Sequence, residues 1–141
     1  MRARARQVRT LILCVLVASL IAASVLFYVQ WRDTDDLMQY VESVFEGQIP
    51  FEETSDSPLR RYNWTNDGDI PNHGSDVIVE LDLRRMFVLH NYFDGRIWVT
   101  YSVKIYTRDG FVYESSSNVS STWIIHKTKD GWEIVRIIER T

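Results

Sequence analysis

The sequence predicts an α+β protein with an N-terminal transmembrane helix, then one short helix packed on a curved four-stranded antiparallel meander. Three observations carry this prediction: an uncharged apolar run, alternating apolar residues in the C-terminal half, and Asp-Gly pairs between the alternating stretches. Long apolar runs suit a bilayer, whereas alternation is typical of strands with one buried face. The expected divisions are a basic tail (1–10), a membrane anchor (11–29), a helix (33–47), an irregular segment (48–75) and a sheet (76–141), with 33–141 forming one domain.

The apolar run "LILCVLVASLIAASVLFYV" has no charge, glycine or proline, and 12 of its 19 residues are Leu, Ile, Val or Phe. Nineteen helical residues span about 28 Å, close to the thickness of the hydrocarbon core of a bilayer. Arginines precede the run at positions 2, 4, 6 and 9, and the positive-inside rule keeps them in the cytoplasm. We therefore expect a single-pass protein of the cell membrane, with a cytoplasmic N-terminus and the C-terminal domain outside.

A cleaved signal peptide is the alternative to a retained anchor, with Ala22-Ala23-Ser24 as a small-residue cleavage site. Cleavage there would leave the apolar stretch "VLFYVQW" as the new N-terminus. The run is also longer than the usual signal core of about 7–15 residues. The retained anchor is therefore the favoured interpretation.

The chain beyond the expected span is acidic. From residue 30 to residue 141 it has 12 Lys and Arg against 19 Asp and Glu, a balance of −7. This balance argues against nucleic acid as a partner, because nucleic-acid-binding proteins carry basic surfaces. The only cysteine, Cys14, lies within the apolar run, so no disulfide or thiol chemistry is expected in the domain.

One amphipathic helix is expected over "DTDDLMQYVESVFEGQIP". Thr34 is the candidate N-cap, and the two aspartates after it suit the positive end of the helix dipole. Gly47 and Pro50 end the helix. No Gly or Pro precedes it, so it either continues the membrane helix as one rod or bends away at residues 31–33. Its apolar stripe consists of Leu37, Val41, Val44 and Phe45.

Loop-forming residues dominate 48–75, where a short helix fits only near Leu59–Trp64, and strand patterns dominate the rest. In "DVIVELDLRRMFVLH" the odd positions up to Phe87 and Leu89 are apolar except at Arg85. In "RIWVTYSVKIYT" the odd positions repeat the pattern. Asp-Gly pairs, which indicate hairpin turns, stand at 94–95, 109–110 and 130–131.

The third and fourth runs are less regular. In "FVYESSSNVSSTWIIHK" we expect one long strand with a bulge at the serines, with Glu114 and His126 on the polar face. The last run, "WEIVRIIE", is apolar at both parities, which suits a strand covered on both faces and completing the sheet. The expected inner face of the third run consists of Phe111, Tyr113, Val119, Trp123 and Ile125, and the two faces of the last run of Trp132 with Ile134 and Val135 with Ile137.

One helix followed by a four-stranded meander that curves round it resembles the cystatin-like architecture. The closing "KDGWEIVRIIE" is similar to the end of many nuclear-transport-factor-like domains, the superfamily that includes SnoaL-like proteins. There, a lysine, an acidic-Gly turn, a tryptophan and an Ile-rich strand complete the roll. The resemblance covers 34–47 and 76–139, and 48–75 departs from it by being loop-like. Inhibitory cystatins carry a Gln-x-Val-x-Gly loop, whereas the first hairpin here is "LHNYFDG", so protease inhibition is not expected.

Four side chains are candidate binding residues. Arg85 and Tyr101 share the parity of the inner face, and an inward charge must find an acid or reach the rim. Trp98 and Tyr106 lie on the polar face of the second strand. Aromatic residues on such a face are enriched at protein interfaces, and cross-strand packing is the alternative explanation.

No catalytic residue, metal site or cofactor is expected. The three histidines stand apart from other metal ligands, and the chain has neither a Ser/His/Asp signature nor a Gly-rich phosphate loop. Asn63-Trp64-Thr65 and Asn118-Val119-Ser120 match the N-glycosylation sequon.

These observations favour a protein-interaction or assembly module held outside the membrane, not an enzyme, with other membrane or envelope proteins as partners. The layout is similar to assembly components of type IV secretion and conjugation machines. The alternative is a small-molecule-binding or sensing domain, with Arg85 or Tyr101 at the wall of an apolar pocket. A SnoaL-like enzyme is the third hypothesis. A core filled by Leu37, Val41, Phe45 and Trp123 would argue against the last two.

Overall fold

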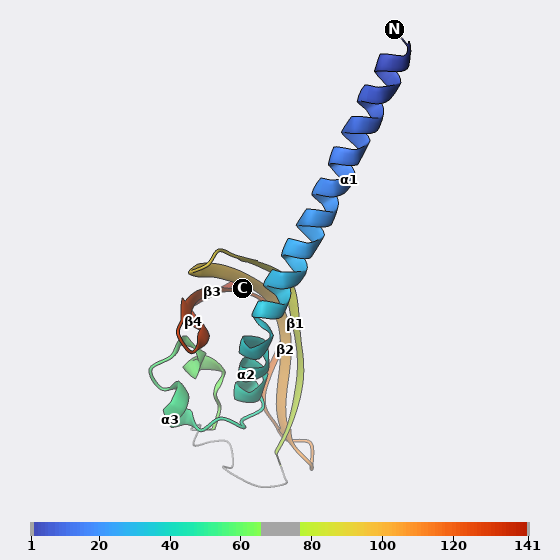
Figure 1. The fold of residues 1–141 in the computed structure, drawn as a ribbon. Helices are drawn as coiled ribbons and strands as arrows, with labels where there is room; N and C mark the ends of the chain where they lie inside the picture. Colours follow the sequence, from blue (N-terminus) through green and yellow to red (C-terminus); the bar gives the residue numbers. More distant parts are fainter. Residues whose placement is uncertain (1, 66–76, 141) are drawn as a thin grey trace.

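The structure is a computed structural model that describes residues 2–65 and 77–140, with side chains from residue 7 onward. It confirms the α+β class (Figure 1). Four strands form one open antiparallel sheet in the order β1-β2-β3-β4, so each strand pairs with its neighbours in the chain. The elements are α1 (Arg2–Asp33), α2 (Asp35–Phe45), α3 (Phe51–Thr54), the 3₁₀ helix η1 (Pro58–Tyr62), β1 (Val77–His90), β2 (Asp94–Thr107), β3 (Val112–Thr128) and β4 (Gly131–Arg140).

Helix α1 projects from the rest of the molecule as a long rod (Figure 1). Its segment Gln7–Asp33 has 27 residues and is long and apolar enough to cross a membrane. A signal sequence near an N-terminus has the same properties. The described residues contain one helix of this kind, as the sequence predicts.

The chain bends between its first two helices, which point in different directions in Figure 1. Thr34 stands at the N-cap position of α2, but its hydroxyl makes no capping hydrogen bond. The hydroxyl is buried and donates to the carbonyl oxygen of Trp31, at 3.1 Å, in the last turn of α1. The prediction that the Thr34 side chain caps α2 is therefore wrong, because that side chain serves the helix before it.

Helix α2 lies against the concave face of the sheet (Figure 1). Its predicted apolar stripe is buried throughout, and it meets a fully buried row of the sheet that includes Ile97 and Trp123. Burial of each such side chain stabilises the fold by about 1.5–3 kcal/mol. The centre of the domain is thus packed by Leu37, Val41, Phe45 and Trp123, which argues against a ligand held there between helix and sheet. The cavity described below lies beside this packed centre, and of these four residues Phe45 lines it.

A β-bulge at Met86 reverses the alternation of β1. Arg85 pairs with Val99 and Phe87 pairs with the adjacent Trp98, which leaves Met86 without a partner in β2. Beyond the bulge, Phe87 is exposed and the residue after it is fully buried. The prediction that Phe87 and Leu89 share the inner face with Arg85 is wrong, because an inserted residue exchanges the two faces.

The long third strand and its bulge are confirmed. Between the partners of Tyr101 and Val103, β3 contains one extra residue beside Asn118, whose φ is 52°. Beyond this point Glu114 and Ser116 stand opposite inner-face residues of β2. The prediction that Glu114 belongs to the polar outer face is wrong for the same reason as in β1.

The last strand contains a bulge at Val135. Trp132 and Ile134 are buried as predicted, while Val135 is exposed. The extra residue places Ile137 and Glu139 on the same inner side as Ile134, and Ile137 packs against the core. The prediction of a strand with two apolar, covered faces is therefore wrong. β4 has one apolar face, and at the bulge the inward-facing side chains change from even-numbered to odd-numbered positions.

Two of the three Asp-Gly pairs stand at hairpin turns, as predicted. The exception is Asp94-Gly95, which begins β2 and lies within its pairing with β1. The turn is formed by the three residues before it, where the side-chain oxygen of Asn91 accepts the backbone N–H groups of Phe93 and Asp94, at 2.7 and 2.8 Å. An Asx turn therefore closes this hairpin.

The segment predicted as irregular contains two short helices, α3 and η1. Ser57 caps η1 by accepting the N–H of Leu59 at 3.2 Å, and Pro58 occupies the first turn. Leu59 and Tyr62 of η1 are buried. This agrees with the expected short helix near Leu59–Trp64, and residues 66–75 of the predicted loop lie outside the described part of the chain.

Arg85 fastens the bend between α1 and α2 to the sheet. Its side chain is 8% exposed and pairs with the Asp35 carboxylate at 2.5 Å. One guanidinium nitrogen also donates to the Thr34 hydroxyl at 2.7 Å and to the Trp31 carbonyl at 2.8 Å. The guanidinium lies 4.1 Å from the centre of the Trp31 ring, within cation–π range.

A second contact holds the last turn of α1 against the ends of the strands. The amide of Gln30 donates to the carbonyl of His90 at 3.0 Å and accepts its N–H at 3.4 Å. The Asp33 carboxylate accepts the indole N–H of Trp132 at 2.8 Å and lies 3.6 Å from the Lys127 ammonium. The helix is therefore attached to the sheet through β1, β3 and β4.

Replacing Arg85 with Ala should lower the free energy of unfolding by about 3 kcal/mol, because the Asp35 carboxylate and the Trp31 carbonyl lose their shared cation. The neighbouring Arg84→Ala is the matched control. Arg84 is exposed and its ion pair within the described residues is with Asp82, so its loss should lower the free energy of unfolding far less than the loss of Arg85. Urea unfolding of the full chain in detergent measures both, and equal losses would contradict the role given to Arg85.

Candidate functional site

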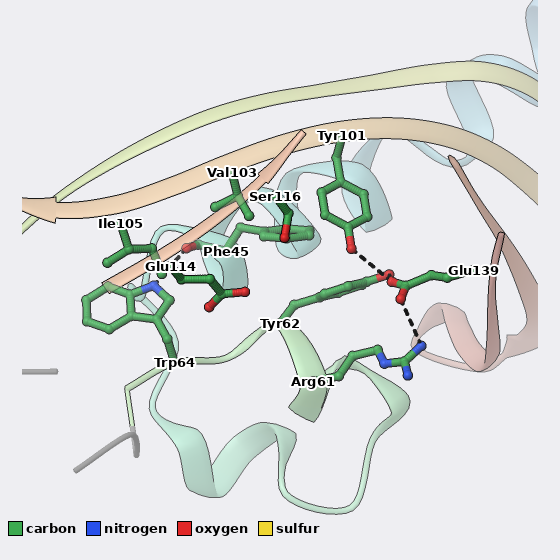
Figure 2. A pocket seen from close by; sticks show the side chains of 10 residues that line it. All are labelled: Phe45, Arg61, Tyr62, Trp64, Tyr101, Val103, Ile105, Glu114, Ser116 and Glu139. Atoms are coloured by element: carbon green, nitrogen blue, oxygen red, sulfur yellow. Dashed lines mark hydrogen bonds and ion pairs between the residues drawn. The ribbon is translucent and has the colours of Figure 1, made fainter. Parts of the chain in front are cut away.

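A cavity of about 210 Å³ lies between the end of α2, η1 and the inner face of the sheet. Figure 2 shows side chains from both layers pointing into it. Its walls combine aromatic rings with carboxylates, a hydroxyl and a guanidinium. The lining residues are Phe45, Arg61, Tyr62, Trp64, Tyr101, Val103, Ile105, Glu114, Ser116 and Glu139.

Glu139 is the polar centre of this site. One oxygen of its carboxylate accepts two hydroxyls, from Tyr62 at 2.8 Å and from Tyr101 at 2.9 Å (Figure 2). The other oxygen lies 3.6 Å from the guanidinium of the exposed Arg61. The bulge at Val135 is what places Glu139 on the inner side of β4. The arrangement joins η1, β2 and β4 through one carboxylate.

The aromatic side of the cavity is closely packed. The Tyr62 ring stacks on Phe45, with 4.4 Å between centroids, and meets Tyr101 edge-on at 5.5 Å. The indole N–H of Trp64 donates to the Phe45 carbonyl at 2.9 Å, which fixes the orientation of the indole. Gly47, with φ +72°, allows this position, because a Cβ there would stand 2.3 Å from the Trp64 ring.

Glu114 and Ser116 form the unpaired polar side. Figure 2 shows the Glu114 carboxylate directed into the cavity, between Trp64 and Tyr62. Neither Glu114 nor Ser116 has a side-chain hydrogen bond or ion pair with any residue of the described chain. The lining therefore contains two carboxylates against one guanidinium, and the carboxylate of Glu114, an exposed residue, has no partner among the described residues.

Both tyrosine hydroxyls are donors at neutral pH. Burial, the largest cause, raises the pKa of Tyr62 to about 12, with the hydrogen bond to Glu139 acting in the same direction. Burial also raises the pKa of Tyr101 far above its ordinary value, together with the nearby Tyr62 and Glu139. Groups that hold their protons this firmly bind and orient a partner, and they are unsuited to act as general bases.

The structure separates the four predicted binding residues. Tyr101 lines the cavity, whereas Arg85 lies at the bend between α1 and α2. Trp98 packs its ring on Phe87 across the strands, with 5.5 Å between centroids. Tyr106 donates its hydroxyl to Glu80 at 2.7 Å. The two outer-face aromatics thus make cross-strand contacts and Arg85 contacts the bend, and a binding role for these three residues stays a prediction.

Sequence reasoning missed Glu139, Glu114 and Tyr62. The signal for Glu139 was the break in alternation along "WEIVRIIE", which also fits a strand covered on both faces. Tyr62 follows the Ser-Pro pair at 57–58, which is a recognisable start for a short helix.

The two sequons differ in their surroundings. The side-chain nitrogen of Asn63, to which a glycan would be attached, is buried and donates to the Ile49 carbonyl and the Thr54 hydroxyl, at 3.0 and 2.9 Å. Asn118 is exposed at the β3 bulge. Only Asn118 therefore offers an accessible acceptor in the folded domain.

Within the described residues, no three His, Cys, Asp or Glu side chains gather closely enough to hold a metal ion.

Neither the scan against protein-family models nor the searches among curated proteins and solved structures finds a match for this chain. The cystatin-like and SnoaL-like resemblance therefore stays a prediction. The site has to be interpreted from its own geometry.

The raised pKa of Tyr62 predicts a loss of stability at alkaline pH. Tyrosine in the unfolded chain ionises near pH 10, whereas folded Tyr62 keeps its proton up to about pH 12. As the pH rises, the unfolded state loses this proton first. The contribution of Tyr62 to the free energy of unfolding is therefore fully present below about pH 10 and is lost between about pH 10 and 12.

Tyr62→Phe should flatten this decline, as measured by urea unfolding at a series of pH values. The control is Tyr92→Phe, which removes an exposed hydroxyl in the β1–β2 turn and should leave the slope unchanged. An unaltered slope in Tyr62→Phe would show that Tyr62 does not titrate as described.

Proposed function

We propose that this chain is a single-pass membrane protein whose domain outside the membrane binds a small organic cation in the cavity beside Glu139. The observation that carries the proposal is the Glu114 carboxylate, which faces an aromatic-lined cavity and has no partner among the described residues. Carboxylates with aromatic rings around them are the groups that hold ammonium ions in proteins.

The size of the cavity limits the ligand. Sites for drug-sized molecules usually measure about 300–1,000 Å³, so 210 Å³ suits a compact group such as a primary or quaternary ammonium. The Glu139 carboxylate already accepts two hydroxyls, and Glu114 is therefore the side chain that would face the positive charge. The rings of Tyr62 and Trp64 lie on either side of it.

Binding without catalysis is the activity that this chemistry supports. The lining contains no histidine, and the two tyrosines hold their protons at neutral pH. In the sequence analysis, the small-molecule-binding hypothesis expected Arg85 or Tyr101 at the wall of an apolar pocket. The cavity has Tyr101 in that place but is more polar than expected.

The test is saturation-transfer NMR with tetramethylammonium, a probe that does not partition into lipid, added to the full chain in lipid nanodiscs. We expect a saturable signal that Glu114→Gln weakens at least about fivefold, since one unit charge is removed. Glu133→Gln, on the exposed outer face of β4, is the matched control and should bind as the unchanged chain does. Equal binding by both variants would refute the site.

An assembly module remains the second candidate, supported by the β2–β3 hairpin. Phe111, predicted to be buried, is 61% exposed there, and its neighbour Val112 is also exposed. Figure 1 shows this hairpin at the end of the sheet opposite to α1, where it would reach partners away from the membrane.

Crosslinking in native membranes, with a C-terminal tag for purification, tests the assembly role. A recurring membrane or envelope partner should disappear with Phe111→Ser and persist with Tyr92→Ser, which alters an exposed aromatic in the opposite hairpin. Recovery of the chain alone, with no partner, would count against the assembly role.

A further inference from the structure

We propose that the outer face of the sheet beside α1 rests on the surface of the bilayer that α1 crosses. The inference depends on the proposed membrane anchor and is independent of the cavity. The membrane-facing patch, as we name it, comprises two rows across the four strands and the tip of the β1–β2 hairpin.

The pairing register defines the two rows. The first row runs Phe87, Trp98, Thr122 and Ile138, and the second runs Leu89, Arg96, Ile124 and Arg136. The row between them points inward and is buried in the core, so these two rows point outward. Phe87, Leu89 and Ile138 are exposed on this face. Among the described residues outside α1 and the patch, the other exposed large apolar side chains are Tyr40, Met86, Phe111, Val112 and Val135.

The position of the patch follows from its contacts with α1. The ring of Phe87 stacks on Phe27, with 5.6 Å between centroids, and Phe27 belongs to the predicted span 11–29. The hydrogen bonds between Gln30 and His90 hold the end of β1 at the residue where that span ends. The edge of the patch beside α1 therefore lies at the boundary of the expected hydrocarbon core.

The curvature of the sheet gives the patch its direction. Figure 1 shows the strands bending over α2 beside the lower end of α1, so that their outer face turns toward the side from which α1 projects. The β1–β2 hairpin lies at this end of the sheet. At its tip Tyr92 is 82% and Phe93 is 62% exposed. The Lys127 N–H donates to the Phe93 carbonyl at 2.7 Å and holds the tip in place.

The chemistry of the patch fits a lipid headgroup region. Tyrosine, tryptophan and phenylalanine side chains favour this zone, and arginine can lay its apolar stem on lipid while its guanidinium meets a phosphate. Arg96 and Arg136 stand among the apolar residues, although the domain as a whole is acidic. Asp94 and Glu133 lie in the next outer row, and their negative charges offset those of the two arginines. We therefore expect the arginines to contact the phosphate groups of zwitterionic lipids, without a preference for anionic lipids.

Spin labels in the full chain test this proposal. Cys14→Ala removes the only cysteine, and Tyr92→Cys then places one label on the patch in phosphatidylcholine nanodiscs. Oxygen concentrates in lipid and a nickel chelate stays in water, so the ratio of their collision rates measures depth. We expect this ratio to be several times higher at position 92 than at Phe111→Cys, the matched exposed aromatic in the opposite hairpin.

A third label, at Val17→Cys, separates this inference from the anchor itself. A lipid-exposed label at 17 together with equal, water-like ratios at 92 and 111 would overturn the patch and leave the anchor standing. Water-like ratios at all three positions would overturn both. Adding Leu89→Glu to the Tyr92→Cys chain should lower the ratio at 92 severalfold, while Val112→Glu should leave it unchanged.

Discussion

The contact on which the arrangement of this molecule depends is the one between Arg85 and the bend after α1. A long helix and a curved sheet have no fixed relative orientation unless something at their junction determines it. Arg85 does so from the middle of β1, because its guanidinium meets an acid, a hydroxyl, a carbonyl and an indole of the bend at once. Such a buried cation is costly unless every partner is in place, which favours one orientation over its neighbours.

Bulges are the second constraint, since they decide which polar groups enter the domain. A strand with unbroken alternation would carry Glu114 and Glu139 on its outer face. One extra residue in β3 and one in β4 exchange the faces, and both carboxylates reach the inner side at the end of α2. The cavity thus depends on two local departures from regular pairing, and the aromatic rings complete its wall.

The fold could be predicted from the sequence wherever one pattern continues without interruption. The stripe from Leu37 to Phe45 and the odd positions of β2 follow their periods and were assigned correctly, and the apolar run forms a helix long enough to cross a membrane, as predicted. Phe87, Glu114 and Ile137 were misplaced, because a bulge changes parity without changing composition. Tyr101 was recognised as inward-facing, but its partner Glu139 could not be, since the two side chains are 38 positions apart and meet only after β4 shifts its register.

The attachment of α1 also links two directions that are independent in most anchored proteins. A flexible linker lets a domain turn freely about the axis of its anchor. Here Gln30 and Asp33 of the helix itself are hydrogen-bonded to the strands. A rotation of α1 about its own axis therefore turns the domain with it and changes the direction in which the cavity opens. If α1 is the membrane anchor proposed above, a neighbour that packed against one side of it within the bilayer would determine which way the cavity faces along the membrane plane.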